Sequence, residues 1–86
     1  MTWINREKLV KEIFGNLVDR VTLVYHRGKR HICVTKFMDG GVPLSCSVPF
    51  WGCKSNEHVR ARVEGVKAVF EDAVKTPPAW LYEASQ

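Results

Sequence analysis

Two short glycine-containing turns constrain the fold of this chain more than any other feature of its sequence. The first is Arg27-Gly28-Lys29-Arg30 and the second is Asp39-Gly40-Gly41. Apolar and polar residues alternate on both sides of each turn, over residues 20–26, 31–38 and 42–50. Tight turns between alternating segments are typical of β-hairpins. The sequence therefore predicts a three-stranded antiparallel meander.

The expected pairing of these strands gives the sheet two different faces. We expect Arg27 to oppose Arg30 in the first hairpin and Met38 to oppose Val42 in the second. Successive side chains of a strand point to opposite faces. The face predicted to form the core carries Val21, Leu23, Tyr25, Ile32, Val34, Leu44, Cys46, Val48 and Phe50. The other, open face carries Thr22, Val24, His26, His31, Cys33, Thr35, Phe37, Ser45 and Ser47.

Helical periodicity on both sides of the strands supplies a cover for the core face. Near the start, apolar residues recur every four positions after a predicted cap at Asn5, and Gly15 offers a stop. A second helix should begin after Ser55 or Asn56 and end before Pro77. The predicted fold class is α+β, a single α-β-β-β-α domain over residues 1–78, with both helices packed on one sheet face. The tail, residues 79–86, should dock through Trp80 on the core or on a partner.

Composition places the chain among ordinary globular proteins. The 86 residues are 45% hydrophobic and 26% charged, with a net charge of +4. No apolar run is long enough to cross a membrane or to form a signal-peptide core. Three cysteines are an odd number, which cannot close into a complete disulfide framework. We therefore expect reduced thiols in a cytoplasmic protein, and no membrane partner.

Neither a metal centre nor a catalytic centre is expected. Cys46, Cys53 and His58 have the spacing Cys-x6-Cys-x4-His, which lacks the short ligand pairs of zinc sites. The predicted pairing places Cys33 on the other face from Cys46. His26, His31 and Cys33 could form a dyad, but no acidic residue or phosphate-binding loop accompanies them. The sequence therefore indicates a protein that is not an enzyme and has no cofactor.

A small domain without catalytic groups favours a protein-binding module or inhibitor that occupies a partner's surface. The open face is poor in charge for a solvated sheet face, which is typical of a contact surface. Aromatic and arginine side chains dominate binding energies in protein interfaces. The expected partner-binding residues are Val24, His26, Arg27, Lys29, Arg30, His31, Cys33, Phe37 and Trp51.

Nucleic-acid binding is the alternative, because the turn between the first two strands is basic. Its candidate residues are Arg20, Arg27, Lys29, Arg30, Lys54, Arg60 and Arg62. The element order over residues 5–75 resembles double-stranded-RNA-binding domains and the small Alu-RNA-binding subunits of the signal recognition particle, a resemblance that implies RNA as a ligand. The lysine-rich start of the second helix in the former is replaced here by residues 55–58, Ser-Asn-Glu-His. Two copies could also pair through the open face or the edge of strand 20–26, since Pro43 and Pro49 blunt the opposite edge.

Overall fold

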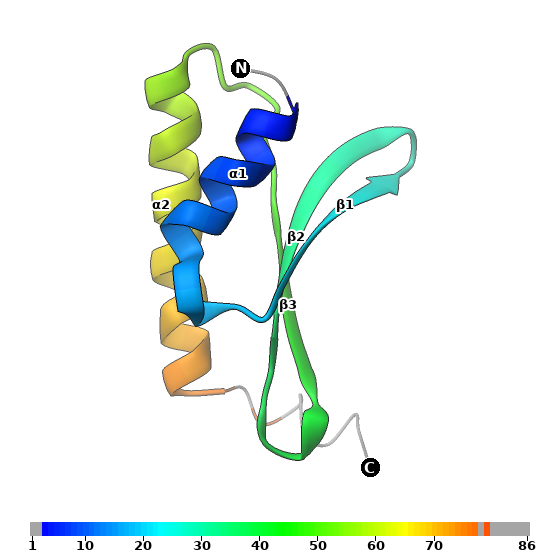
Figure 1. Ribbon diagram of the computed structural model, residues 1–86, viewed down its shortest axis with the longest axis vertical. Coiled ribbons are helices and arrows are strands. Elements are labelled where there is room, and N and C mark those ends of the chain that lie inside the picture. The colour runs from blue at the N-terminus through cyan, green and yellow to red at the C-terminus, as the bar shows by residue number, and fades with distance from the viewer. Residues whose placement is uncertain (1–2, 78, 80–86) are drawn as a thin grey trace.

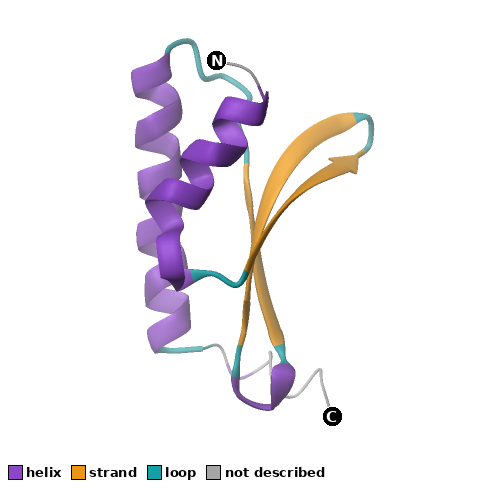
Figure 2. Cartoon of the chain, viewed as in Figure 1, coloured by secondary structure: helices purple, strands orange, loops and turns teal. Residues whose placement is uncertain are grey.

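The computed structural model describes residues 3–77 and 79, with side chains from residue 5 onward. Two helices and a three-stranded antiparallel sheet follow one another in the order α-β-β-β-α (Figures 1 and 2). The expected α+β fold is thus confirmed. The elements are α1 (Trp3–Phe14), a short 3-10 turn (Gly15–Leu17), β1 (Arg20–His26), β2 (Lys29–Phe37), a second 3-10 turn (Asp39–Gly41), β3 (Pro43–Val48) and α2 (Asn56–Lys75). The prediction for the Trp80 tail lies outside the described residues.

The ends of the helices follow local sequence signals, with one exception. The Ser55 hydroxyl accepts a hydrogen bond from the His58 N–H at 3.1 Å, which caps α2 as expected. Gly15 has φ +52 and ends α1, as its freedom in the left-handed region allows. The predicted cap at Asn5 is wrong, because α1 already begins at Trp3 and Asn5 therefore lies in its first turn.

The strands pair in the order β1-β2-β3, and the second hairpin has the predicted register. The first hairpin is tighter than predicted. Tyr25 rather than Arg27 opposes Arg30, and Leu23 rather than Tyr25 opposes Ile32. The pair next to the turn is His26 and Lys29. Arg27 and Gly28 form a two-residue turn with φ of 53° and 75°, the left-handed pair of a type I′ turn, whose twist suits a hairpin. Because this slip is by two residues, every side chain keeps its predicted face.

The core lies between the sheet and the two helices. Both helices cover the same face (Figure 1). Between α1 and α2 the Phe14 and Phe70 rings meet edge to face, with their centroids 6.0 Å apart. The buried residues are Leu9, Val10, Phe14, Ile32, Val34, Leu44, Val48, Phe50, Val59, Val63 and Phe70. Val21 and Cys46 pack against this core while partly buried.

Two residues predicted for the core are not in it. Leu23 is 41% exposed and Tyr25 is 62% exposed, although both lie on the helix side of the sheet. β3 pairs with β2 only as far as the Ile32–Val48 pair, and the β1–β2 hairpin continues beyond it (Figure 1). We call residues 24–31 of this hairpin the arm. The arm curves away from the helices, so the helices leave Tyr25 uncovered (Figure 1).

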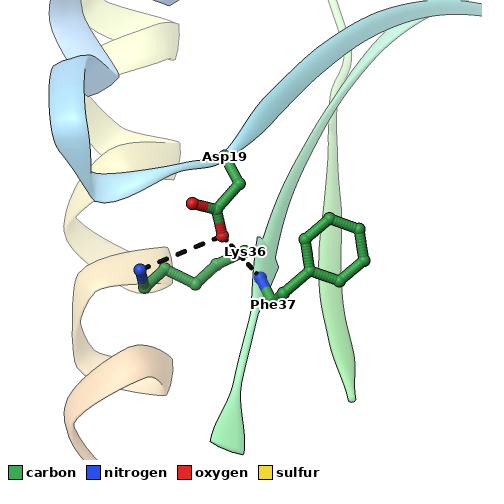
Figure 3. A network of polar contacts seen from close by, with 3 residues as sticks. All are labelled: Asp19, Lys36 and Phe37. Atoms are coloured by element: carbon green, nitrogen blue, oxygen red, sulfur yellow. Dashed lines mark hydrogen bonds and ion pairs between the residues drawn. The ribbon is translucent and has the colours of Figure 1, made fainter. Parts of the chain in front are cut away.

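Asp19 fixes the start of β1 to the end of β2 (Figure 3). Its carboxylate Oδ2 accepts a hydrogen bond from the Phe37 N–H at 2.8 Å and lies 4.0 Å from the Lys36 Nζ. Its own N–H donates to the Thr35 carbonyl at 2.8 Å. A side chain thus takes the place of a backbone acceptor where the ladder ends, and this anchors the base of the hairpin from which the arm extends.

Candidate binding surface

The positive charge of the protein is concentrated in one hairpin. The chain has 13 Lys and Arg residues against 9 Asp and Glu. Five of the basic residues and none of the acidic ones lie within residues 20–38, so the rest of the chain has eight basic and nine acidic residues. The hairpin therefore carries a charge of +5 and the remainder −1. A field this localised steers the encounter with an acidic surface.

The basic tip of the arm has one residue in an unfavourable backbone conformation. Arg27, at φ 53, is the one non-glycine residue with positive φ within the described chain. Left-handed backbone costs roughly 1–2 kcal/mol for most residues, and Asn, Asp or Gly usually occupy this turn position. Arg27 and Lys29 are exposed and have no ion pair within 4 Å among the described residues. Strain of this kind is common at functional sites.

The two faces of the arm carry different chemistry. On the helix side, the Arg30 guanidinium stacks over the Tyr25 ring at 5.6 Å. On the open side lie Val24 and the His26 and His31 rings, whose centroids are 6.4 Å apart. Tyrosine, arginine and histidine side chains are thus presented together on a two-stranded ribbon that projects from the domain.

The open face of the sheet is uncharged along its middle but is not one apolar patch. Cys33 lies between Thr22 and Ser47, and the Thr35 and Ser45 hydroxyls are hydrogen-bonded at 3.0 Å. Val24 lies beside His31, whereas Phe37 lies six residues further along β2, roughly 20 Å away at the usual rise of a strand. The register therefore separates Val24 from Phe37, over whose ring Arg20 stacks at 5.5 Å.

A cleft of about 390 Å³ opens where the arm leaves the domain. We call it the basic cleft; its lining residues are Arg6, Gly28, Lys29, Arg30, His31, Phe50 and Trp51. The Arg6 guanidinium lies over the Phe50 ring at 5.1 Å. The Nδ1 atom of His31 is buried and has no hydrogen-bond partner among the described residues. The cleft thus combines positive charge with aromatic walls, and it contains no acidic residue.

Trp51 is the most exposed aromatic side chain of the described chain, at 74%. The Arg62 guanidinium lies 6.0 Å from its ring and donates to the Pro49 carbonyl at 3.0 Å. That hydrogen bond joins α2 to the loop after β3 and holds Trp51 at the mouth of the basic cleft. Four arginine–aromatic contacts occur in the described chain, and three of them involve a residue of the arm or of the basic cleft.

The structure brings together most of the residues proposed for partner binding. Six of them form the arm, Trp51 borders the same cleft as Lys29 to His31, and Cys33 lies next along β2. Phe37 lies at the opposite end of the open face. Sequence reasoning missed Arg6 and Phe50 as cleft residues, because only the three-dimensional fold places α1 beside the arm; it also missed Tyr25, which it placed in the core.

The residues proposed for nucleic-acid binding are more dispersed. Arg27, Lys29 and Arg30 share the arm, but Arg20 stacks on Phe37 at the far end of the sheet. Arg60 and Arg62 are two residues apart in α2 and so point to nearly opposite sides of the helix. Lys54 lies in the loop before α2, where its N–H donates to the His58 Nδ1 at 3.5 Å. The arm is the part of this set that forms one surface.

The thiols and acids of the described residues do not assemble into a centre. No group of three or more His, Cys, Asp or Glu side chains comes close enough there to hold a metal ion. Cys33 opposes Ser47 and Cys46 opposes Val34, so their side chains lie on opposite faces, as expected. Burial raises the pKa of the Cys46 thiol above its ordinary value of 9.0, and the nearby Cys33 raises it further.

Two further findings bear on function. Within residues 3–77 and 79, neither helix has the length and apolarity required to cross a bilayer. Comparison of the chain with protein-family models, with curated proteins and with solved structures found no match in any of the three.

Proposed function

We propose that this protein is a small intracellular protein-binding module or inhibitor, which acts by occupying an acidic surface of a partner protein. The observation that carries the proposal is the arm, in which basic, aromatic and apolar side chains project together beyond the domain. The hairpin has a charge of +5 and no acidic residue. Because charges across an interface are complementary, we expect an acidic surface on the partner.

The arm supplies the side-chain types that dominate protein interfaces. Tyr25 and Arg30 are stacked on one another, which limits the rotamer freedom that binding would otherwise remove. On the open side of the arm, Val24 and His31 form a weakly polar area that continues to Cys33. We assign carboxylate binding to Arg27 and Lys29, and desolvated contact to Val24 on the open side. Trp51 widens the same surface across the mouth of the cleft.

A charge-reversal pair tests the proposal. Lys29→Glu changes the arm, and Lys8→Glu makes the same change on the exposed side of α1. In affinity capture from lysate of the native cells, after nuclease treatment, Lys29→Glu should lose the protein partner and Lys8→Glu should retain it. A partner retained by Lys29→Glu, or lost equally by both variants, would contradict the role of the arm. Circular dichroism checks that both variants are folded.

A second pair of variants separates the arm from the rest of the open face. Val24→Asp and Phe37→Asp each place a carboxylate on this face, roughly 20 Å apart at the usual strand rise. If the partner occupies the arm end only, Val24→Asp should abolish capture and Phe37→Asp should weaken it little. Loss of capture with both variants would instead extend the interface over the whole face.

Nucleic-acid binding is a second candidate, favoured by the basic cleft. Its arginine, lysine and aromatic lining matches the combination by which proteins hold single strands, with bases stacked on rings and phosphates near cations. This reading predicts binding of single-stranded oligonucleotides at low salt, with an affinity that falls steeply as salt rises. Absence of such binding, together with a nuclease-resistant protein partner, would eliminate it.

A further inference from the structure

The two edges of the sheet differ in how well they are protected. The outer edge of β3 begins with Pro43, and Pro49 directly follows the end of the strand; neither residue can donate a backbone hydrogen bond to another strand. β1 pairs only with β2, and its residues 21–25, Val-Thr-Leu-Val-Tyr, contain neither proline nor charge. Natural proteins usually protect an exposed edge with such residues because it can pair with another strand. The exposed edge of β1 can therefore form backbone hydrogen bonds with a further strand.

The turn determines which backbone groups of β1 face that edge. In a two-residue hairpin, the residues that flank the turn form a hydrogen-bonded pair, here His26 and Lys29. Hydrogen-bonded and non-hydrogen-bonded pairs alternate along the ladder. The N–H and C=O groups of Val24 and Thr22 consequently face β2, and those of Val21, Leu23 and Tyr25 point outward.

We propose that β1 pairs with β1 of a second copy of this chain, antiparallel, to form a symmetric dimer with a continuous six-stranded sheet. Leu23 lies on the twofold axis opposite Leu23 of the second copy, and Val21 opposes Tyr25. In this register, the three outward-facing residues of each copy form about six backbone hydrogen bonds with those of the other copy. The dimer does not depend on the proposed function.

Apolar side chains that are exposed in the single chain match one another in this register. Leu23 (41% exposed) packs on its own counterpart, and Tyr25 (62% exposed) packs on Val21. All of these side chains lie on the helix side of the sheet. Pairing therefore covers the two apolar residues of β1 that the helices leave uncovered, as an isologous interface requires.

A cavity of about 210 Å³ lies where the second copy's Tyr25 would arrive. It is formed beside Val21 at the start of β1, and Val18 and Lys11 also line it. Val18 and Val21 offer apolar contact to the ring, and the Lys11 ammonium offers a cation for its face. The single chain thus has both a projecting tyrosine and, at the matching position across the twofold axis, a recess for it.

Charges at the two ends of β1 are complementary in the same arrangement. One residue beyond each end, Asp19 opposes Arg27 of the second copy, and Arg20 opposes His26. Because the strands are antiparallel, the two basic tips lie at opposite ends of the interface and do not repel one another closely. The register thus has no pair of like-charged Lys, Arg, Asp or Glu residues directly opposite one another.

Analytical ultracentrifugation of the intact chain tests the dimer. The wild-type mass should double as concentration rises through the micromolar range. Leu23→Lys and Leu23→Glu should each be monomeric, because each places two like charges together on the twofold axis. An equimolar mixture of the two should form a heterodimer, since the opposite charges then meet. Val24→Lys, on the same strand but the open face, should still dimerise.

Several results would overturn the proposal. These are a wild-type chain that stays monomeric at about 0.5 mM, a Leu23→Lys chain that still dimerises, and a mixture that does not recover the dimer. If the charged variants fail to fold, Tyr25→Ala provides a milder test on an exposed side chain. It should weaken association at least about tenfold, the size of effect expected on removing an interface anchor. Unchanged association of Tyr25→Ala would also contradict the register.

Discussion

The β1–β2 hairpin behaves as two regions, although it is one continuous element. Under the helices, Ile32 and Val34 are completely buried, whereas toward the arm Leu23 is 41% exposed and Tyr25 is 62% exposed. All four residues lie on the same face of the same sheet. The difference comes only from where α1 and α2 end and where β3 leaves β2. Alternation along a strand determines the direction of a side chain but not what covers it.

The two regions also differ in how many features that lower folding stability each of them has. The covered region has no buried charged or polar residue within the described chain. The arm has exposed apolar side chains, adjacent positive charges and a left-handed arginine. Such features destabilise a fold slightly and are retained where they serve binding. The predictions below test this division, beginning with the largest expected effect.

The sharpest test compares alanine substitutions at two residues that oppose each other. Ile32→Ala should lower the free energy of unfolding by about 2–5 kcal/mol, because it leaves a cavity in a closed core. Leu23→Ala, measured on the monomer at low concentration, should cost less than about 1 kcal/mol, as partly exposed sites do. Urea denaturation measures both. Equal losses would show that the arm's base is as well packed as the core.

Substitution of Asp19, which anchors the base of the hairpin, should lower the free energy of unfolding by an intermediate amount. Asp19→Ala removes the acceptor of the Phe37 N–H and should cost about 1–2 kcal/mol. This is below the roughly 1.5–3 kcal/mol usual for a hydrogen bond to a charged group, because the Asp19 side chain is partly exposed. Asp19→Asn retains an oxygen acceptor in the same position and should recover most of the loss. Thermal denaturation compares the two variants. A loss as large with Asn as with Ala would show that the charge matters more than the acceptor.

Substitution at the tip of the arm should raise stability and lower binding. Arg27→Asn places a residue that tolerates left-handed backbone in the type I′ turn and should stabilise the fold by about 0.5–1 kcal/mol. The same variant removes a basic side chain and should weaken capture of the partner. Denaturation and capture assays on one preparation measure both effects. A variant that gains stability and keeps full binding would show that Arg27 has no binding role.

The smallest effect concerns the thiol that packs against the core. Because burial and the neighbouring Cys33 raise the pKa of Cys46, its thiolate is scarcer in the folded chain than in the unfolded chain near pH 9. Iodoacetamide should therefore alkylate Cys46 more slowly in native protein than in urea, as peptide mass spectrometry can quantify. The associated stability is present below pH 9.0 and is lost as pH rises through the raised pKa. Equal rates would contradict the burial.

Much of this fold could be predicted because its signals are local. The glycine turns, the Ser55 cap and the alternation of residues 42–48 each act over a few residues, and the structure has all of them. The register of the first hairpin was missed because an arginine is unusual in the left-handed position that the shorter turn requires. The exposure of Leu23 and Tyr25 could not be predicted, because it depends on the relative lengths of elements that are far apart in sequence.

The candidate surface was predictable in part for the same reason. The basic residues of the arm are neighbours in sequence, so their clustering could be read directly from it. The basic cleft could not, since Arg6 and Trp51 reach it from α1 and from the loop after β3. Val24 and Phe37 lie on the same open face, as expected, but far from one another, because sharing a face does not bring two residues close along a strand.

The contact between Phe14 and Phe70 has a consequence for synthesis on the ribosome. Both hairpins pair residues that are close in sequence, so the meander can form as soon as residue 50 has emerged. α2 follows it in the chain and provides Val59, Val63 and Phe70 to the core. Until α2 emerges, the nascent sheet presents Ile32, Val34 and Val48 without their full cover, and during that interval it is most exposed to chaperones and to aggregation.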